Sequence, residues 1–250
     1  MNPPPSSTPI TYDQHAAFFG ATGSGKTYRQ TMMLYWRMRR LQEAQVSPTA
    51  YKIIQVDTKR AGPGYDERVG YFAPELRQFG GVLVDDYHKF RLTSPTDPAY
   101  HVYRPPREAQ TPESFDAFFA YLMTQDVSNG RSRIQLPMLI IIDEYTDIFS
   151  GATSRTSYMP SFSKILQQGR STMQTFWLAS QKTSWIDSDI RANVTARFVF
   201  RMVDERDRER VAQMMGDKIV KQRIRAVHGF WFQNDLFEWS LSPIYFNGRA

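Results

Sequence analysis

The feature that most constrains this chain is the octapeptide Gly-Ala-Thr-Gly-Ser-Gly-Lys-Thr at residues 20–27, which fills every position of the pattern G-x-x-x-x-G-K-[ST]. Its glycines allow the backbone to adopt positive φ and to turn N–H groups inward around a phosphate. The lysine supplies a positive charge to the β- and γ-phosphates, and the last threonine offers a hydroxyl to Mg²⁺ at a helix start. The predicted nucleotide-binding residues are Gly20, Ala21, Thr22, Gly23, Ser24, Gly25, Lys26 and Thr27.

The residues on either side of this motif place it between a strand and a helix. The apolar run at 16–19 has the length of a short buried strand, and residues 28–45 have helical spacing of apolar side chains. Strand, loop and helix in this order form the setting in which the motif binds phosphate. We therefore predict that the chain binds a nucleoside triphosphate together with Mg²⁺.

A second group of candidate residues follows the apolar run at 136–142, which ends in Asp143 and Glu144. An unbroken apolar run is typical of a central parallel strand that is buried on both faces. Because the carboxyl ends of parallel strands face the ligand crevice, Asp143 is predicted to lie beside Thr27 and to bind Mg²⁺ with it. Glu144 is predicted to polarise the attacking water, so the predicted catalytic residues include Lys26, Asp143 and Glu144.

A further predicted strand at 175–181 ends in Gln181. A glutamine at this position is suited to orient the lytic water or to sense the γ-phosphate, although a structural role is more common for a glutamine taken alone. The paired Asp85 and Asp86 follow another short apolar run, and a solvated strand end is favoured over a metal site. The four histidines, which are predicted to be structural because they stand far apart, are His15, His88, His101 and His228.

The rest of the chain alternates predicted strands and helices, which is typical of α/β proteins. The tail alternates apolar and polar residues around Asn234-Asp235, which predicts a β-hairpin from about residue 226. We predict a single α/β domain over 13–250 with a mainly parallel central sheet flanked by helices, after a flexible proline-rich segment at 1–12. Further strands are predicted at 51–57, 81–84, 100–104 and 197–202, and further helices at 113–125, 161–171 and 204–215.

Composition narrows the class of protein. The 250 residues contain no cysteine, which excludes disulfides and thiol catalysis. No apolar run approaches the roughly 18 residues of a membrane span, and the first residues lack the pattern of a signal peptide, so we expect a cytoplasmic protein. The net charge of +6 favours an acidic partner, with nucleic acid first. Basic candidates for such a contact, each more commonly part of a solvated surface, are Arg131, Arg133, Lys218, Lys221, Arg223 and Arg225.

Taken in order, these motifs resemble the FtsK–HerA superfamily of DNA-pumping ATPases from about residue 16 to 215. Three more stretches support the resemblance: Asp57-x-Lys59, the run Leu-Gln-Gln-Gly-Arg at 166–170, and the run from Ser188 to Arg197. The sequence departs from the family pattern at Thr58, where proline is usual, and at Lys182-Thr183, where Arg-Pro is frequent. These departures argue against a close relationship to bacterial chromosome pumps.

The resemblance implies a RecA-like P-loop NTPase core that assembles as a ring, usually a hexamer, and moves double-stranded DNA by hydrolysing ATP with Mg²⁺. A short chain of this kind is similar to the genome-packaging ATPases of tailless icosahedral viruses that contain an internal membrane. The implied partners are duplex DNA without sequence preference, further copies of the chain, and a capsid-vertex or membrane protein of a virion. The implied location is the host cytoplasm or the packaging vertex of the virion.

Arg170 is the candidate for a residue that acts on the neighbouring subunit of such a ring. It follows Gly169 at the end of a predicted helix between the acidic strand and the glutamine strand. From there an arginine would reach the next subunit's nucleotide and stabilise charge on the transferring phosphoryl group. A surface or intersubunit salt bridge is the alternative role, and Arg191 and Arg197 are competing candidates.

Other functions share parts of this pattern. A conjugative or plasmid DNA-transfer ATPase would carry the same core, and filamentous-phage assembly ATPases begin with such a loop but normally carry a membrane anchor. A non-translocating switch protein would bind nucleotide and a protein partner and would hydrolyse the nucleotide slowly. Glu144 argues against this alternative, because it is predicted to polarise the attacking water. A GTPase is disfavoured because the sequence has no Asn-Lys-x-Asp motif.

Overall fold

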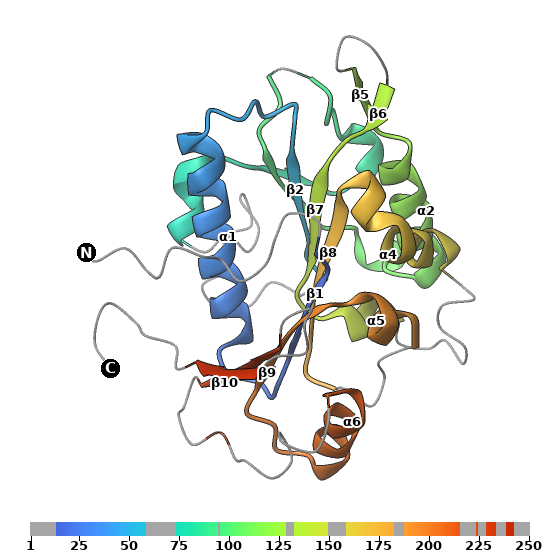
Figure 1. Ribbon diagram of the computed structural model, residues 1–250. Coiled ribbons are helices and arrows are strands. Elements are labelled where there is room, and N and C mark those ends of the chain that lie inside the picture. Colours follow the sequence, from blue (N-terminus) through green and yellow to red (C-terminus); the bar gives the residue numbers. More distant parts are fainter. Residues whose placement is uncertain are drawn as a thin grey trace.

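The computed structural model describes residues 14–58, 74–94, 96–128, 133–149, 159–182, 188–215, 224, 229–233 and 239–242 (Figure 1). Several predictions concern residues outside these ranges and are therefore not addressed by the structure. They are the flexible segment 1–12, the turn at 234–235, Lys59, Thr183, His228, and the basic residues Arg131, Lys218, Lys221, Arg223 and Arg225.

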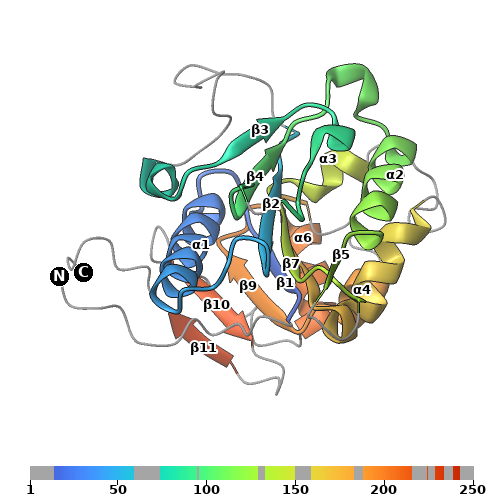
Figure 2. The ribbon, with the colours of Figure 1, turned by 90° about the horizontal axis from the view of Figure 1, so that it is seen from above.

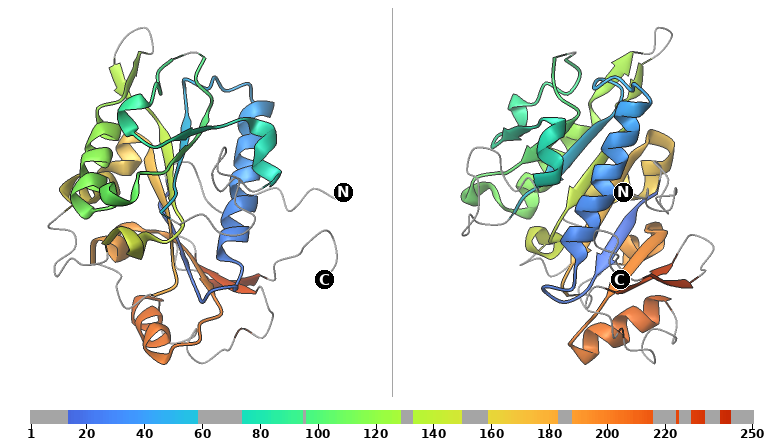
Figure 3. Two further views of the ribbon diagram at one scale, coloured as in Figure 1. Left: turned by 180° about the vertical axis from the view of Figure 1, so that it is seen from behind. Right: turned by 90° about the vertical axis from the view of Figure 1, so that its left-hand side faces the viewer.

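The described residues form a nine-stranded sheet in the order β11-β10-β9-β1-β8-β7-β2-β4-β3. Every pair from β9 to β3 is parallel, whereas β10 is antiparallel to both of its neighbours. This arrangement confirms the predicted mainly parallel sheet and the C-terminal hairpin, which lies at the sheet edge and is coloured red in Figure 3. The strands are β1 (Ala16–Phe19), β2 (Lys52–Val56), β3 (Val82–Val84), β4 (Tyr100–Tyr103), β7 (Met138–Ile142), β8 (Gln174–Ser180), β9 (Ala196–Phe200), β10 (Phe230–Gln233) and β11 (Trp239–Ser242).

Helices cover both faces of this sheet. Figures 1 and 2 show α1 on one face and α2 and α4 on the other. The long helices are α1 (Lys26–Glu43), α2 (Pro112–Met123), α4 (Pro160–Thr172) and α6 (Glu205–Met215), each within about two residues of its prediction. The short elements, which have too few residues for a periodic signal, are α3 (Tyr145–Phe149), α5 (Ser188–Asn193), three 3₁₀ turns at Pro74–Phe79, Tyr87–Lys89 and Arg107–Ala109, and a small hairpin of β5 (Asp126–Ser128) and β6 (Arg133–Gln135).

The core lies on both sides of the central strands. All five residues of β7 and all seven of β8 are buried, as expected for parallel strands covered on both faces. On the α2 side, the ring of Phe162 in α4 lies 5.5 Å from that of Phe119 in α2 and 4.7 Å from that of Phe176 in β8, so aromatic side chains from three elements form this part of the core. On the other side, α1 buries Met33 and Leu34 against the sheet. This packing holds β1, β7 and β8 in a fixed relation to one another.

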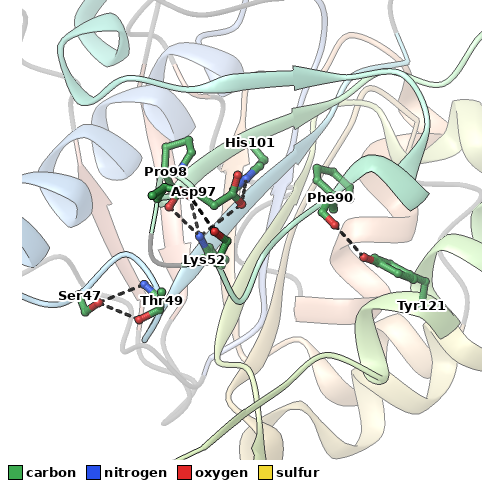
Figure 4. Close-up of polar contacts among 10 residues, drawn as sticks. Ser47, Thr49, Lys52, Phe90, Asp97, Pro98, His101 and Tyr121 are labelled. Carbon is green, nitrogen blue, oxygen red and sulfur yellow. Dashed lines mark hydrogen bonds and ion pairs between the residues drawn. The ribbon is translucent and has the colours of Figure 1, made fainter.

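The amino-terminal ends of β2 and β4 carry a buried polar cluster, shown in Figure 4. The ammonium of Lys52 donates to the carbonyl oxygens of Asp97 and Pro98 at 3.1 and 2.9 Å. The Asp97 carboxylate also lies 2.7 Å from Nε2 of His101. Burial lowers the pKa of both Lys52 and His101, and the adjacent carboxylate offsets part of that effect. The cluster joins β2 and β4 at their amino-terminal ends, whereas the motif at 20–27 follows the carboxyl end of β1. Because the cluster lies at the opposite end of the parallel strands from that motif, we assign it a structural role.

Two other predicted structural groups lie at strand ends. Nδ1 of His15 accepts a hydrogen bond from the backbone N–H of Phe176 at 2.9 Å, which ties the start of β1 to β8. Asp85 is exposed and pairs with Lys89 at 2.7 Å, while Asp86 accepts the N–H of His88. The paired aspartates are therefore a solvated strand end with a local turn, as the sequence favoured.

Candidate nucleotide-binding site

The motif at 20–27 forms the turn from β1 into α1. Gly23 and Gly25 have φ of +72° and +100°, a region that L-residues with side chains seldom adopt, and Gly25 caps the start of α1. Gly20 is required for a different reason, because a Cβ atom there would lie 2.6 Å from Cβ of Phe200 on β9. The glycines thus serve two purposes, namely the inward turn of the loop and its close approach to the neighbouring strand.

The side chain of Lys26 bends back over the loop. Its ammonium donates to the carbonyl oxygens of Gly20 at 2.5 Å and Ala21 at 3.0 Å, and the residue is buried. A compact ammonium held at the loop is a point charge suited to phosphate oxygens. In a nucleotide complex, those oxygens would compete with the two carbonyl groups as acceptors.

Thr27 and Asp143 meet at the carboxyl ends of β1 and β7. The Thr27 hydroxyl donates to Oδ1 of Asp143 at 2.9 Å, which is the proximity that the sequence predicted. A hydroxyl and a carboxylate are hard oxygen donors, and Mg²⁺ is commonly bound through one or two such groups together with substrate phosphates. The donor set therefore fits Mg²⁺, and Thr27 and Asp143 are the residues that would hold it.

Glu144 is buried beside Asp143, and its carboxylate accepts hydrogen bonds from two sides. The Thr146 hydroxyl donates to Oε1 at 2.5 Å. The backbone N–H of Gln181 lies 3.0 Å from Oε2 and 3.3 Å from Oε1. Because β7 and β8 are neighbours in the sheet, the residues after their carboxyl ends are brought together.

Gln181 also contacts the phosphate-binding motif. Its Oε1 accepts a hydrogen bond from the hydroxyl of Thr22 at 2.6 Å, and both side chains are exposed. The structure thus brings Lys26, Asp143, Glu144 and Gln181 to one edge of the sheet.

Two contacts in this group were not foreseen from the sequence: Thr22 with Gln181, and Thr146 with Glu144. Thr146 belongs to no known motif. Its position two residues after a predicted catalytic carboxylate is the one sequence feature that points to it.

The sequence has no match among family models, and no curated protein matches it. Solved structures do match. The genome packaging NTPase B204 from Sulfolobus turreted icosahedral virus 2 in complex with sulfate aligns with a TM-score of 0.63 at 12% identity, covering 94% of this chain and 99% of that one. Its complex with AMPPCP aligns with a TM-score of 0.61 at 13% identity, covering 94% and 100%. This chain has the fold of these genome packaging NTPase structures.

A second group of solved structures matches over part of its own length. ATPases 2 and 3 of EssC from Geobacillus thermodenitrificans align with a TM-score of 0.61 at 14% identity, covering 95% of this chain but 40% of that one. Within the described residues, none of the helices is both long and apolar enough to cross a membrane.

The fold places the candidate arginines differently. The side chain of Arg197 is buried, which disfavours it as the arginine that reaches a neighbouring subunit. It donates to Oε1 of Gln233 at 3.0 Å and to the carbonyl oxygen of Arg191 at 2.8 Å, and burial lowers its pKa. Arg197 therefore ties the hairpin to the end of α5. Arg170 lies in α4, and its side chain is not among those described.

The acidic residue of the Asp57-x-Lys59 stretch also has a local partner. Asp57 is buried after the end of β2, and its Oδ2 accepts from two nitrogens of Arg104, Nε at 3.2 Å and Nη2 at 3.0 Å. Arg104 follows β4, so this ion pair joins two neighbouring strand ends. This ion pair lies at the carboxyl ends of β2 and β4, farther along the sheet from Asp143.

Proposed function

We propose that this protein is a Mg²⁺-dependent ATPase that translocates double-stranded DNA and packages a viral genome into a preformed capsid. The observation that carries the ATPase part is the convergence of Lys26, the Thr27–Asp143 pair, Glu144 and Gln181 on one sheet edge. These groups supply the parts that phosphoryl transfer requires, namely phosphate binding, a metal site and a carboxylate for the attacking water.

Each residue has a defined task in this proposal. The loop N–H groups and Lys26 hold the β- and γ-phosphates, while Thr27 and Asp143 hold Mg²⁺, which supplies positive charge to neutralise the phosphates. Glu144 orients the attacking water and accepts its proton, and the amide of Gln181 contacts the same water or the γ-phosphate. A ring neighbour would contribute Arg170 to the transferring phosphoryl group.

Two observations support DNA packaging as the use of this hydrolysis. The chain matches nearly the whole of a viral genome packaging NTPase, whereas it matches less than half of the EssC structure. Its net charge of +6 suits a partner made of phosphates. We propose duplex DNA without sequence preference, a hexameric ring, and a capsid-vertex or membrane protein as partners. The proposed location is the host cytoplasm or the packaging vertex of the virion.

Rival functions differ in what accelerates turnover. A conjugative or plasmid DNA-transfer ATPase would respond to DNA in the same way. The genes that lie next to its own gene distinguish it from a packaging ATPase. A secretion ATPase is favoured by the likeness to the Type VII Secretion ATPase EccC from Thermomonospora curvata, and it would respond to a peptide rather than to DNA. A non-translocating switch would hydrolyse ATP slowly whether or not DNA is present.

The test is steady-state ATP hydrolysis with and without duplex DNA of several unrelated sequences. We expect DNA to accelerate turnover to a similar extent for each sequence, and DNA affinity to fall steeply as NaCl rises from 50 to 200 mM, because phosphate contacts release counterions. The variant Lys26→Ala is the control for contaminating activity. Turnover that DNA does not change, or salt-insensitive binding to one sequence, would contradict a translocation role.

A further inference from the structure

The carboxylate of Glu144 is held by one donor in α3 and by one directly after the end of β8. One is the hydroxyl of Thr146, 2.5 Å from Oε1, and the other is the backbone N–H of Gln181, 3.0 Å from Oε2. An O–H donor at this distance from a carboxylate is a charge-assisted hydrogen bond, stronger than a neutral one. The pair of donors restrains both oxygens of a side chain that would otherwise rotate about its χ angles.

Thr146 is itself held firmly. It lies in α3, between Tyr145 and Ile148, and both of these side chains are 1% exposed and packed in the core. The short helix is therefore anchored on the sheet, and the Thr146 hydroxyl is presented from a rigid support. The backbone N–H of Gln181 is the other donor to Glu144. The side chain of Gln181 contacts the phosphate-binding motif, because its Oε1 accepts a hydrogen bond from the hydroxyl of Thr22.

We propose that Thr146 is a positioning residue for ATP hydrolysis, because it fixes the direction of the Glu144 carboxylate toward the attacking water. This inference rests on the proposed function. It assigns Thr146 no contact with the nucleotide, so its loss lowers the rate of the chemical step and leaves ATP binding unchanged. The alternative is that the Thr146–Glu144 contact stabilises only the start of α3, in which case the protein is less stable but turnover per folded molecule is normal.

The first experiment compares Thr146→Val, which keeps the shape and removes the donor, with Thr146→Ser, which keeps the donor. We expect Thr146→Val to lower kcat about 10- to 100-fold, with KM and the Kd of a fluorescent ATP analogue within about twofold of the parent. Thr146→Ser should stay within about threefold of the parent kcat. Thr146→Ala, with the same loss of donor and a smaller side chain, replaces Thr146→Val if the valine variant does not fold.

The second experiment asks whether Thr146 acts through Glu144. In a Glu144→Gln background, Thr146→Val should lower kcat by less than about twofold, because the carboxylate that it positions is absent. A loss in this background as large as in the parent would overturn the inference, and so would unchanged or faster turnover in Thr146→Val alone. If neither the parent nor Thr146→Ser hydrolyses ATP although both bind the analogue, the proposed function itself fails.

Discussion

At the scale of single residues, Lys26 and Glu144 lie at one site but are expected to act on different steps. Lys26→Ala removes the ammonium that is held at the loop, so ATP binding and turnover should both weaken. Glu144→Gln keeps the loop and a side chain of the same shape, so ATP should still bind while hydrolysis slows by roughly two orders of magnitude or more. Binding of a fluorescent ATP analogue and phosphate release measure the two effects separately. Near-normal turnover in Glu144→Gln would refute its role as the catalytic carboxylate.

At the scale of elements, the seating of α4 on β8 depends on Gly169. A Cβ atom at this position would lie 2.2 Å from the backbone oxygen of Gln174 and 2.6 Å from the ring of His15, so either the helix or the strand would have to shift. Glycine has a low helix propensity, but it is present in the interior of α4 because the helix approaches the backbone of β8 too closely for a larger residue.

Gly169→Ala should therefore destabilise the protein by about 1–3 kcal/mol, since the strain exceeds the gain in helix propensity. Urea denaturation measures the change, and the midpoint of thermal unfolding should fall by several degrees. Gln168→Ala is the matched control, because Gln168 is exposed on the same helix and its loss should change the free energy of unfolding by less than about 0.5 kcal/mol. Equal stability of the two variants would mean that α4 adjusts without cost.

At the scale of the whole molecule, the proposed ring gives Arg170 its role. Arg170→Ala and Lys26→Ala subunits should each be inactive alone, because one lacks the arginine and the other lacks the phosphate-binding lysine. When they are mixed, some interfaces pair an intact loop with an intact arginine, so part of the ATP hydrolysis should return.

Energy transfer between labelled subunits is the control for exchange between rings. Full activity of Arg170→Ala by itself would eliminate the assignment. Failure of the mixture to recover activity, in rings that do exchange subunits, would place the role of Arg170 within one subunit or in a salt bridge. Arg197 is the less favoured candidate, since its guanidinium donates to Gln233 and to the carbonyl oxygen of Arg191.

Much of the fold was predictable because its signals are local. The apolar run before Asp143 became β7, buried along its whole length, and the glycine-rich turn adopts the positive φ values that its glycines permit. The contact of Thr27 with Asp143 was also predictable, since parallel strands bring their carboxyl ends to the same edge. Short elements such as α3 escaped prediction because five residues are too few to display a helical period.

The sequence by itself determined the motif at 20–27, the long helices and strands, and the edge of the sheet at which the candidate site lies, because each depends on contiguous residues or on a general rule of parallel sheets. Only the tertiary structure decided that β8 lies between β1 and β7. That order places Gln181 against both Thr22 and Glu144, and packing decided that Arg197 is buried and that Gly169 touches β8. Such contacts depend on a few ångströms between side chains far apart in the chain, and no local pattern of residues encodes those distances.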